Sequence, residues 1–405
     1  MYTTAKGALP TPFAYPLYIM AKAAGPACNL ACDYCYYLSK AELFGRGRTH
    51  MDDTTLERYI KSYMEAQTGP VVQFTWHGGE PTLRRLDFYR KAMELQRKYA
   101  GGRAVENSLQ TNGTLLTDEW CRFLHDNGWL VGVSIDGPEE FHNEYRRTAL
   151  GKGTFHKVMN GIRMLQRHNV DWNAMAVVND YNADHPAEFY NFFKDIGCQY
   201  LQFTPIVERR TATGALASGT TPGGELTPMS VHPEQWGEFL CGGFDLWVRS
   251  DVGRVFVQIF DATLAGYVGA EPGLCTMGKH CGHAAVMEHN GDVYACDHFV
   301  FPSHYLGNIN RMSVVEMMMS ERQMAFGASK QAGLTQQCRK CDYLAMCNGE
   351  CPRNRFGISR TGEAGHNYLC EGYRRFFAHS EPYFRFMAAE LEAGRAPANV
   401  MNLKL

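Results

Sequence analysis

The sequence predicts an α/β fold with a parallel sheet covered by helices, followed by a smaller cysteine-rich module. Six short β-rich runs alternate with segments of helical periodicity between residues 16 and 208. A stretch rich in Gly, Thr, Ser and Pro follows at 209–231, and eight of the fourteen cysteines lie between positions 275 and 370. A chain of 405 residues exceeds the size at which one hydrophobic core keeps growing, so two modules are expected.

The predicted strands cover residues 16–22, 71–79, 104–114, 130–137, 171–178 and 200–208. Between the first two strands, apolar residues recur at helical spacing, at Leu56, Tyr59, Ile60, Tyr63 and Met64. Asp52 or Asp53, and Thr117, are predicted N-caps of the helices that follow them. Six βα units suit either an open doubly wound sheet or a partial (β/α)6 barrel, and both place their chemistry at the carboxyl ends of the strands.

The second module is predicted from a change in sequence character. Residues 1–231, including the linker 209–231, are expected to form the first domain, and residues 232–274 a helical connection. From position 275 to position 405 the sequence has many short turns and little continuous apolar pattern before a final helix. Because such a segment buries little apolar surface, metal crosslinks are expected to stabilise it.

The composition is that of a globular protein. Apolar residues make up 45% of the chain and charged residues 20%, and the formal net charge is -2, which argues against a nucleic-acid partner. No apolar run reaches the roughly 18 residues that a membrane span needs, and prolines interrupt the N-terminus where a signal sequence would be apolar. We therefore expect a cytoplasmic protein without a membrane partner, whose cysteines bind metal, and secretion with structural disulfides is the alternative.

The first cysteine group is CNLACDYC, in which Cys28, Cys32 and Cys35 have no fourth cysteine or histidine at ligand spacing. A structural zinc site requires four ligands, so three thiolates indicate a site with an open coordination position. Thiolates without oxygen ligands also suit iron–sulfur chemistry. On spacing alone, zinc remains an alternative.

The same stretch resembles the C-x3-C-x-aromatic-C motif of radical S-adenosylmethionine (radical SAM) enzymes, with Tyr34 as the aromatic residue. GGEP at 78–81 and SIDGP at 134–138 follow at the predicted strand ends, in the order found in that family. The resemblance implies a partial (β/α)6 barrel and a [4Fe-4S] cluster held by the three cysteines, whose unique iron binds the amino and carboxylate groups of SAM. It also implies five SAM contacts, at Tyr34, Gly79, Ser134, Arg146 and Val207. Relatives can carry glutamine at the position of His77, and we assign His77 no catalytic role.

The second cysteine group has the spacing Cys275-x5-Cys281-x14-Cys296 and then Cys338-x2-Cys341-x5-Cys347-x3-Cys351-x18-Cys370. Eight cysteines suffice for two clusters with four ligands each, or for two zinc sites. The spacing resembles the SPASM extension of peptide-modifying radical SAM enzymes. That resemblance implies one auxiliary [4Fe-4S] cluster on Cys275, Cys281, Cys296 and Cys351, and another on Cys338, Cys341, Cys347 and Cys370. Cys121, Cys198 and Cys241 are assigned no role, since a free cysteine usually behaves as a small buried hydrophobe.

The residues ACDHF at 295–299 resemble the signature of anaerobic sulfatase-maturating enzymes, as do segments along nearly the whole chain. This resemblance implies oxidation of one cysteine or serine in an unfolded sulfatase to Cα-formylglycine. Asp297 would act as the base, an auxiliary cluster would accept an electron, and flavodoxin or ferredoxin would supply electrons. Another SPASM peptide maturase, for instance one that forms thioethers, is the nearest alternative, and a non-catalytic zinc or iron–sulfur interaction module is an alternative of a different class.

Overall fold

A computed structural model describes residues 17–37, 40–44, 49–215, 217 and 223–403. The chain folds into two compact units. Unit 1 comprises Met1–Ser134, Arg147–Trp172 and His280–Ser329, and unit 2 comprises Ile135–Arg146, Asn173–Lys279 and Lys330–Leu405. The domain boundaries predicted at positions 231 and 275 follow sequence motifs and remain predictions.

Unit 1 is built on a sheet with the strand order β12-β11-β10-β1-β2-β3-β4. The strands are β1 (Tyr18–Lys22), β2 (Val71–His77), β3 (Ala104–Thr111), β4 (Leu130–Ser134), β10 (Ala284–Met287), β11 (Asp292–Tyr294) and β12 (Tyr305–Asn308). Strands β10, β1, β2, β3 and β4 run parallel to one another, whereas β11 pairs antiparallel with β10 and with β12. Strands β1 to β4 follow one another without the reversal that a doubly wound sheet requires, so their order is that of a barrel.

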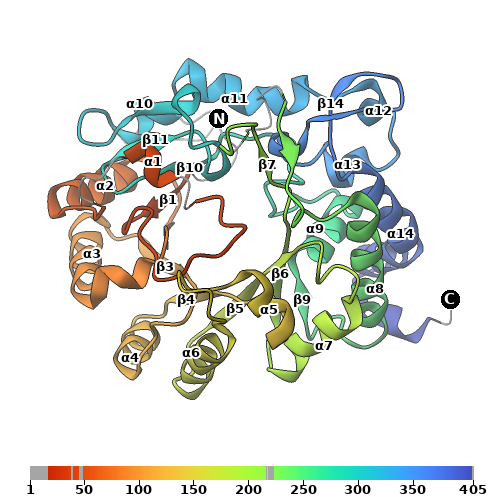
Figure 1. The fold of residues 1–405 in the computed structure, drawn as a ribbon, viewed down its shortest axis with the longest axis horizontal. Coiled ribbons are helices and arrows are strands. Elements are labelled where there is room, and N and C mark those ends of the chain that lie inside the picture. The colour runs from red at the N-terminus through yellow and green to blue at the C-terminus, as the bar shows by residue number, and fades with distance from the viewer. Residues whose placement is uncertain (1–16, 38–39, 45–48, 216, 218–222, 404–405) are drawn as a thin grey trace. The chain divides into compact units, whose positions relative to one another are not determined.

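Helices flank these strands on the outer side in Figure 1. The helices of unit 1 are α1 (Ala41–Phe44), α2 (Asp53–Ala66), η2 (Pro81–Arg84), α3 (Arg85–Tyr99), α4 (Asp118–Asp126), α6 (Phe155–Arg167), η3 (Asp297–Phe299), η4 (Pro302–His304), α10 (Val314–Met318) and most of α11 (Glu321–Ala332). The predicted caps are confirmed, because Asp52 accepts from the Thr55 N–H at 2.8 Å and Thr117 accepts from the Trp120 N–H at 3.3 Å. The predicted apolar face of α2 is buried.

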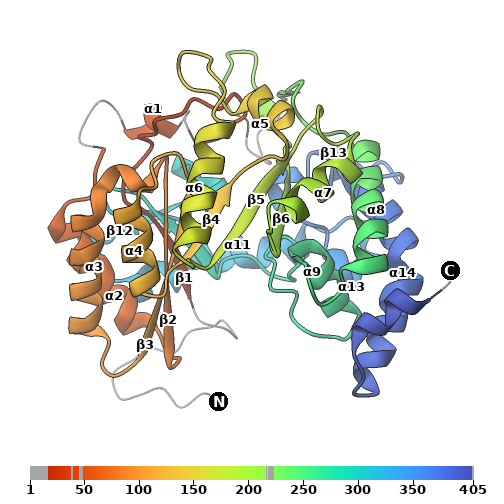
Figure 2. The same cartoon turned by 90° about the horizontal axis from the view of Figure 1, so that it is seen from below.

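Unit 2 contains the parallel strands β5, β6 and β9 in that order. Its elements are β5 (Trp172–Val178), β6 (Tyr200–Pro205), β7 (Arg209–Arg210), β8 (Glu225–Leu226), β9 (Phe256–Val257), β13 (Gly357–Ile358), β14 (Ala364–His366), α5 (Glu139–Tyr145), α7 (Pro186–Asp195), α8 (Pro233–Ser250), α9 (Gln258–Tyr267), α12 (Gln336–Arg339), α13 (Leu344–Cys347), η5 (Pro352–Asn354), α14 (Cys370–Glu392) and η6 (Pro397–Asn402). Helix α14 runs alongside α8 in Figure 2. Their backbones approach closely, since a Cβ on Gly372 would lie 2.2 Å from the Pro233 carbonyl oxygen.

Two parts of the chain are more ordered than the sequence predicts. Residues 284–308, expected to lack a core pattern, add three strands to the sheet of unit 1, and β10 pairs with β1. In the described part of the linker 209–231, β7 and β8 form a two-stranded ribbon. Strands of two to four residues are too short to show a period, which explains why neither was predicted.

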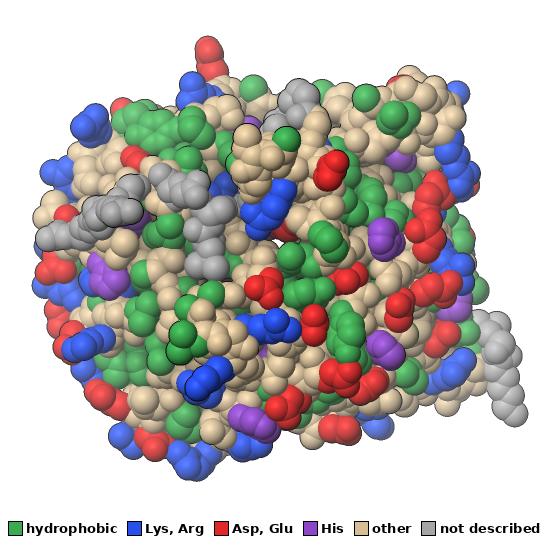
Figure 3. Space-filling view, viewed as in Figure 1, with side chains coloured by type: hydrophobic (Ala, Val, Ile, Leu, Met, Phe, Trp, Pro, Cys, Tyr) green, Lys and Arg blue, Asp and Glu red, His purple; other side chains and the backbone are tan. Residues whose placement is uncertain are grey.

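The surface is mixed in charge. On the face shown in Figure 3, Lys and Arg side chains are interspersed with Asp and Glu. Within the described part of the chain, no helix combines the length and the apolar character needed to cross a bilayer.

Candidate active site

Three neighbouring parallel strands bring polar side chains to one edge of the unit 1 sheet. Lys22 is the last residue of β1, His77 is the last residue of β2, and Glu288 directly follows β10. The register pairs Lys22 with His77 and Ala21 with Met287, so the three side chains lie at the carboxyl ends of adjacent strands. In parallel βα folds this edge is the usual place for chemistry.

Asp297 completes this cluster. It opens the short helix η3, directly after Cys296, and its Oδ1 lies 2.7 Å from the Lys22 ammonium. This contact does not have the geometry of a hydrogen bond and is best described as an ion pair. Oδ2 accepts a hydrogen bond from the Tyr36 hydroxyl. A carboxylate is thus held at two points beside the strand ends.

The Lys22 ammonium has two further contacts. It lies 3.2 Å from His77 Nδ1 and 4.4 Å from the centroid of the Tyr37 ring. Nδ1 of His77 also accepts from the Gly78 N–H at 2.7 Å, so the ring proton of a neutral imidazole belongs on Nε2. Burial, reinforced by Lys22, lowers the pKa of His77 to about 3, which keeps the ring neutral at physiological pH.

The two carboxyl groups of the cluster differ in their electrostatics. Burial would raise the pKa of Asp297, but the positive charge of Lys22 is the main opposing effect, and the net result is a pKa below the usual range. For Glu288, burial dominates and raises the pKa to about 7. Tyr37 donates to Glu288 Oε2, and Oε1 is buried without a hydrogen-bond partner. The cluster therefore combines one ionised carboxylate with one that is partly protonated near neutral pH.

The loop with the first three cysteines is anchored by the backbone of the GGEP segment. Gly79 N–H donates to the Gly25 carbonyl and Glu80 N–H donates to the Ala27 carbonyl, both at 2.8 Å. A Cβ on Gly79 would lie only 2.1 Å from the Ala27 carbonyl oxygen. Glycine is therefore required at this position by the close approach of the two backbones.

A buried side chain, that of Glu80, orders the backbone next to the same loop. Glu80 is fully buried and accepts from the Thr82 N–H, the Thr111 hydroxyl and the Asn112 N–H, at 2.7 to 2.9 Å. The Asn112 side-chain amide points at Cys28 Sγ, 3.8 Å away. Burial raises the pKa of the Cys28 thiol to about 11, so a thiolate there needs a positive partner such as iron.

The five predicted SAM contacts are divided between the units. Tyr34, Gly79 and Ser134 are in unit 1, where the Ser134 hydroxyl accepts from Gln110 at 3.1 Å. Arg146 and Val207 are in unit 2. The Arg146 guanidinium forms a buried bidentate pair with Asp136, at 2.8 and 3.1 Å, so a carboxylate of the chain itself orients it. The roles of all five toward SAM remain predictions.

Four of the later cysteines surround one cavity in unit 2. Cys338, Cys341, Cys347 and Cys370 line a space of about 310 Å³ together with aromatic side chains. Burial, with added repulsion from neighbouring thiolates, raises the pKa of Cys347 and of Cys370 to about 12. Four crowded thiols around one cavity fit a [4Fe-4S] cluster, whose iron would supply the missing positive charge.

The other four cysteines are shared between the units: Cys281 and Cys296 are in unit 1, and Cys275 and Cys351 are in unit 2. In unit 1 the buried Gln323 amide links the two cysteine loops by donating to the Gly282 and Ala295 carbonyls, at 2.8 and 3.1 Å. No disulfide joins any of the fourteen cysteines. Among the described residues, no three Cys, His, Asp or Glu side chains are spaced for a single metal ion, and the ligand sets remain predictions.

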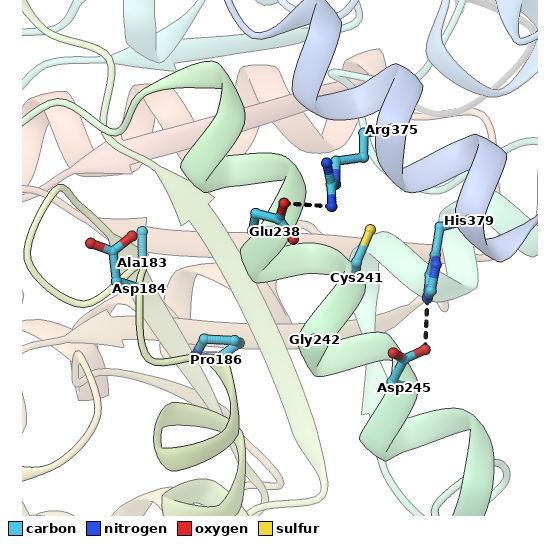
Figure 4. A pocket seen from close by; sticks show the side chains of 9 residues that line it. All are labelled: Ala183, Asp184, Pro186, Glu238, Cys241, Gly242, Asp245, Arg375 and His379. Carbon is cyan, nitrogen blue, oxygen red and sulfur yellow. Dashed lines mark hydrogen bonds and ion pairs between the residues drawn. The ribbon is translucent and has the colours of Figure 1, made fainter.

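Another pocket of unit 2 contains none of the predicted site residues. It measures about 590 Å³ and is lined by helices α7, α8 and α14 (Figure 4). Four of its ionisable side chains form two pairs, Glu238 with Arg375 at 2.5 Å and Asp245 with His379 at 2.7 Å. Cys241 lies beside them with a pKa raised to about 11 by burial, as expected of an unreactive thiol.

Sequence analysis missed several residues of the Asp297 cluster. Lys22, Tyr36, Tyr37 and Glu288 carry no motif, and they meet Asp297 only through the pairing of β10 with β1. The single available signal was a lysine at the end of an otherwise apolar strand, YIMAK, where a buried charge needs a partner.

Comparison with known proteins agrees with this geometry. Residues 24–193 match the radical SAM superfamily model, and residues 275–342 match the SPASM iron–sulfur cluster-binding domain. The chain is 59% identical to a curated serine-type anaerobic sulfatase-maturating enzyme of Bacteroides thetaiotaomicron, over 96% of this chain and 95% of that protein. It is 37% identical to a serine-type enzyme of Klebsiella aerogenes, over 90% and 85% of the two chains. It is 33% identical to a cysteine-type enzyme of Clostridium perfringens, over 91% and 97%.

Solved structures show the same relationship. Native anSMEcpe with bound AdoMet superposes with a TM-score of 0.81 at 32% identity, covering 92% of this chain and all of that one. The same protein with AdoMet and the Cp18Cys peptide also gives 0.81, over 93% and 99%. The predicted fold class, a partial radical SAM barrel with a SPASM-type extension, is confirmed. The chain belongs to the anaerobic sulfatase-maturating enzymes of the radical SAM superfamily.

Proposed function

We propose that this enzyme oxidises a serine of an unfolded sulfatase polypeptide to Cα-formylglycine, with Asp297 as the base. The observation that carries the proposal is the ionised Asp297 carboxylate, held by Lys22 and Tyr36 at the carboxyl ends of the strands, in the same unit as the Cys28 loop. The choice of serine is supported by the relatives, because those named serine-type share 59% and 37% identity with this chain and the cysteine-type relative shares 33%.

Three groups of residues would hold the cofactors. Cys28, Cys32 and Cys35 would hold the cluster that binds SAM, with contacts from Tyr34, Gly79, Ser134, Arg146 and Val207. The auxiliary clusters would use Cys275, Cys281, Cys296 and Cys351, and Cys338, Cys341, Cys347 and Cys370. When bound, these cofactors supply a radical that removes a hydrogen atom and a sink for one electron. A low-potential carrier, flavodoxin or ferredoxin, is proposed as the electron donor, in the cytoplasm.

Residues of this chain accept the proton that the substrate loses. Conversion of a serine CH₂OH group to an aldehyde removes one hydrogen atom from Cβ, then one electron and the hydroxyl proton. Asp297 accepts that proton at a carboxylate oxygen, while Lys22 and Tyr36 hold the carboxylate in place. The neutral His77 ring adds no second positive charge beside the ion pair. An ionised acceptor is therefore present when the electron leaves the substrate.

The test uses three peptides that differ only at the target residue, which is serine, cysteine or alanine. Reconstituted enzyme is incubated anaerobically with SAM and a chemical reductant, and the peptides are analysed by mass spectrometry. We expect the serine peptide to lose the mass of two hydrogen atoms and the alanine peptide to stay unchanged. Conversion of the cysteine peptide alone would show that the serine assignment is wrong, and no conversion despite SAM cleavage would refute the function.

A variant locates the base. Asp297→Asn keeps the shape of the side chain but cannot take up the substrate proton at neutral pH. We expect it to cleave SAM normally and to lose formylglycine formation by about 100-fold, the size of a lost general base. Asp87→Asn serves as the matched control, because it makes the same change at an exposed aspartate that pairs with Arg90, and it should keep wild-type activity.

A further inference from the structure

The environment of Lys22 is unusual for a lysine. Its side chain is fully buried, and the described contacts of the ammonium are the Asp297 carboxylate, His77 Nδ1 and the face of the Tyr37 ring. Burying an ammonium costs several kcal/mol unless its interactions replace water. The contacts with an anion, an acceptor nitrogen and an aromatic face compensate this cost in three directions.

Stability alone does not account for this ion pair. Replacing a buried ion pair with apolar residues of similar volume is often neutral or stabilising. The Lys22–Asp297 pair instead lies at the carboxyl ends of β1 and β2, where the chemistry of this fold class takes place. Its position therefore indicates a role in the reaction.

The charges around Lys22 single out Asp297 as its partner. Two carboxyl groups lie nearby, but the Lys22 ion pair is with Asp297, whereas Glu288 accepts from the Tyr37 hydroxyl. The ammonium of Lys40, by contrast, donates a hydrogen bond to the Val300 carbonyl at 3.0 Å. The cation that contacts Asp297 is thus supplied by the last residue of β1, and its position is set by the sheet.

We propose that Lys22 is a positioning residue that fixes the Asp297 carboxylate for proton transfer from the substrate hydroxyl. The proposal rests on the proposed function above. Lys22 forms an ion pair with one oxygen of the carboxylate, and Tyr36 donates a hydrogen bond to the other, so both oxygens are held. A carboxylate has about four lone-pair directions, so others remain for the substrate.

The step balances without a change in Lys22. After the Cβ hydrogen atom has gone, the substrate O–H bond breaks, its proton goes to an Asp297 oxygen, and its electron pair forms the C=O π bond with the unpaired electron of Cβ. The surplus electron leaves to the proposed auxiliary cluster. Lys22 keeps its proton throughout, so removal of Lys22 affects only the steps after hydrogen abstraction.

The test separates those steps. Lys22→Met keeps the length of the side chain and removes its charge. It is assayed with a serine peptide carrying two deuterium atoms on Cβ, and both the deuterium in 5′-deoxyadenosine and the formylglycine are measured. We expect deuterium transfer as in the wild type and about 100-fold less formylglycine per SAM cleaved. An unchanged ratio of formylglycine to SAM cleaved would overturn the proposal.

A double-mutant cycle tests whether Lys22 acts through Asp297. In an Asp297→Asn background, Lys22→Met should lower formylglycine no further. A further loss would show that Lys22 has an independent role and would overturn the proposal. Lys40→Met is the matched control, since it also removes a buried ammonium of unit 1, one that lies 3.7 Å from the centroid of the Phe301 ring, and it should keep the wild-type ratio.

Two further measurements keep the result interpretable. If the Lys22→Met protein does not bind iron, two other variants are assayed in its place: Lys22→Arg and the double variant Lys22→Met/Asp297→Asn. Lys22→Arg restores the charge and should recover formylglycine formation per SAM cleaved. The double variant removes both charges of the buried pair, so neither is left unpaired, and it should cleave SAM without forming formylglycine. Formylglycine from the double variant would overturn the proposal. Wild-type enzyme that converts no peptide would refute the proposed function, whereas a normal ratio in Lys22→Met would refute only the role of Lys22.

Discussion

Gly79→Ala is expected to disable the radical-forming end of the enzyme. The new Cβ would lie 2.1 Å from the Ala27 carbonyl oxygen, and ordinary contact begins at 3.4 Å, so the two backbones must separate by 1.3 Å. The Gly79–Gly25 and Glu80–Ala27 hydrogen bonds are each 2.8 Å long, and that separation breaks at least one of them. Overpacking costs about 1–3 kcal/mol and a lost hydrogen bond about 1 kcal/mol, which gives about 2–4 kcal/mol in total.

This free energy destabilises the conformation of the loop that contains Cys28. At 1.4 kcal/mol per factor of ten, we expect at least about 30-fold less SAM cleavage in the absence of peptide. The assay is the anaerobic yield of 5′-deoxyadenosine from reconstituted protein with a chemical reductant. Gly243→Ala is the matched control, because a Cβ there meets no atom within 4 Å and the residue lies in helix α8. Wild-type SAM cleavage by Gly79→Ala would refute the reasoning from backbone approach.

Three further predictions follow from buried groups. Glu288 has a pKa raised from 4.5 to about 7, so the folded protein binds more protons than the unfolded chain between those values and stability falls as pH rises. Glu288→Gln should reduce the loss of unfolding free energy between pH 5 and pH 7.5 by up to about 3 kcal/mol, as measured by urea unfolding of the variant and the wild type. An equal loss in both proteins would contradict this prediction. Cys370→Ala should lower iron and sulfide by one [4Fe-4S] equivalent, and an unchanged iron content would exclude Cys370 as a ligand. Asp136→Asn breaks the buried pair with Arg146 and should cost about 3–5 kcal/mol of unfolding free energy, whereas Asp87→Asn at an exposed pair should cost less than about 1 kcal/mol.

The parts of the fold that were predictable are those with a local period. Strands β1 to β6 lie within the predicted ranges because each is a β-rich run of five to eight residues between helical segments. The ends of β2, β3, β4 and β6 were predicted too far along the chain, and β2 stops at His77 because Gly78 adopts a φ of 140°. Strand β10, only four residues long, has no detectable period, and its pairing with β1 depends on residues more than 260 positions apart.

The same distance separates the members of the candidate site. Motifs identified Cys28, Cys32, Cys35 and Asp297 from the sequence, since each belongs to a short local pattern. The ion pair between Lys22 and Asp297 spans 275 positions, and no pattern in a single sequence records it. Sequence therefore predicts the chemistry of the groups, whereas the sheet determines which groups meet.

The addition of β10 and β11 to the barrel sheet gives a structural reason for the position of Asp297 directly after Cys296, a proposed ligand of an auxiliary cluster. In the proposed reaction, oxidation of the substrate radical removes one proton and one electron from the same carbon–oxygen unit. Adjacent residues of a trans peptide have Cα atoms about 3.8 Å apart, so the base and the proposed cluster ligand Cys296 move as one rigid piece of backbone. Pairing of β10 with β1 then aligns that piece with Lys22. The proposed base and the proposed cluster ligand are thus held next to each other by a peptide bond, and beside the strand ends by the sheet.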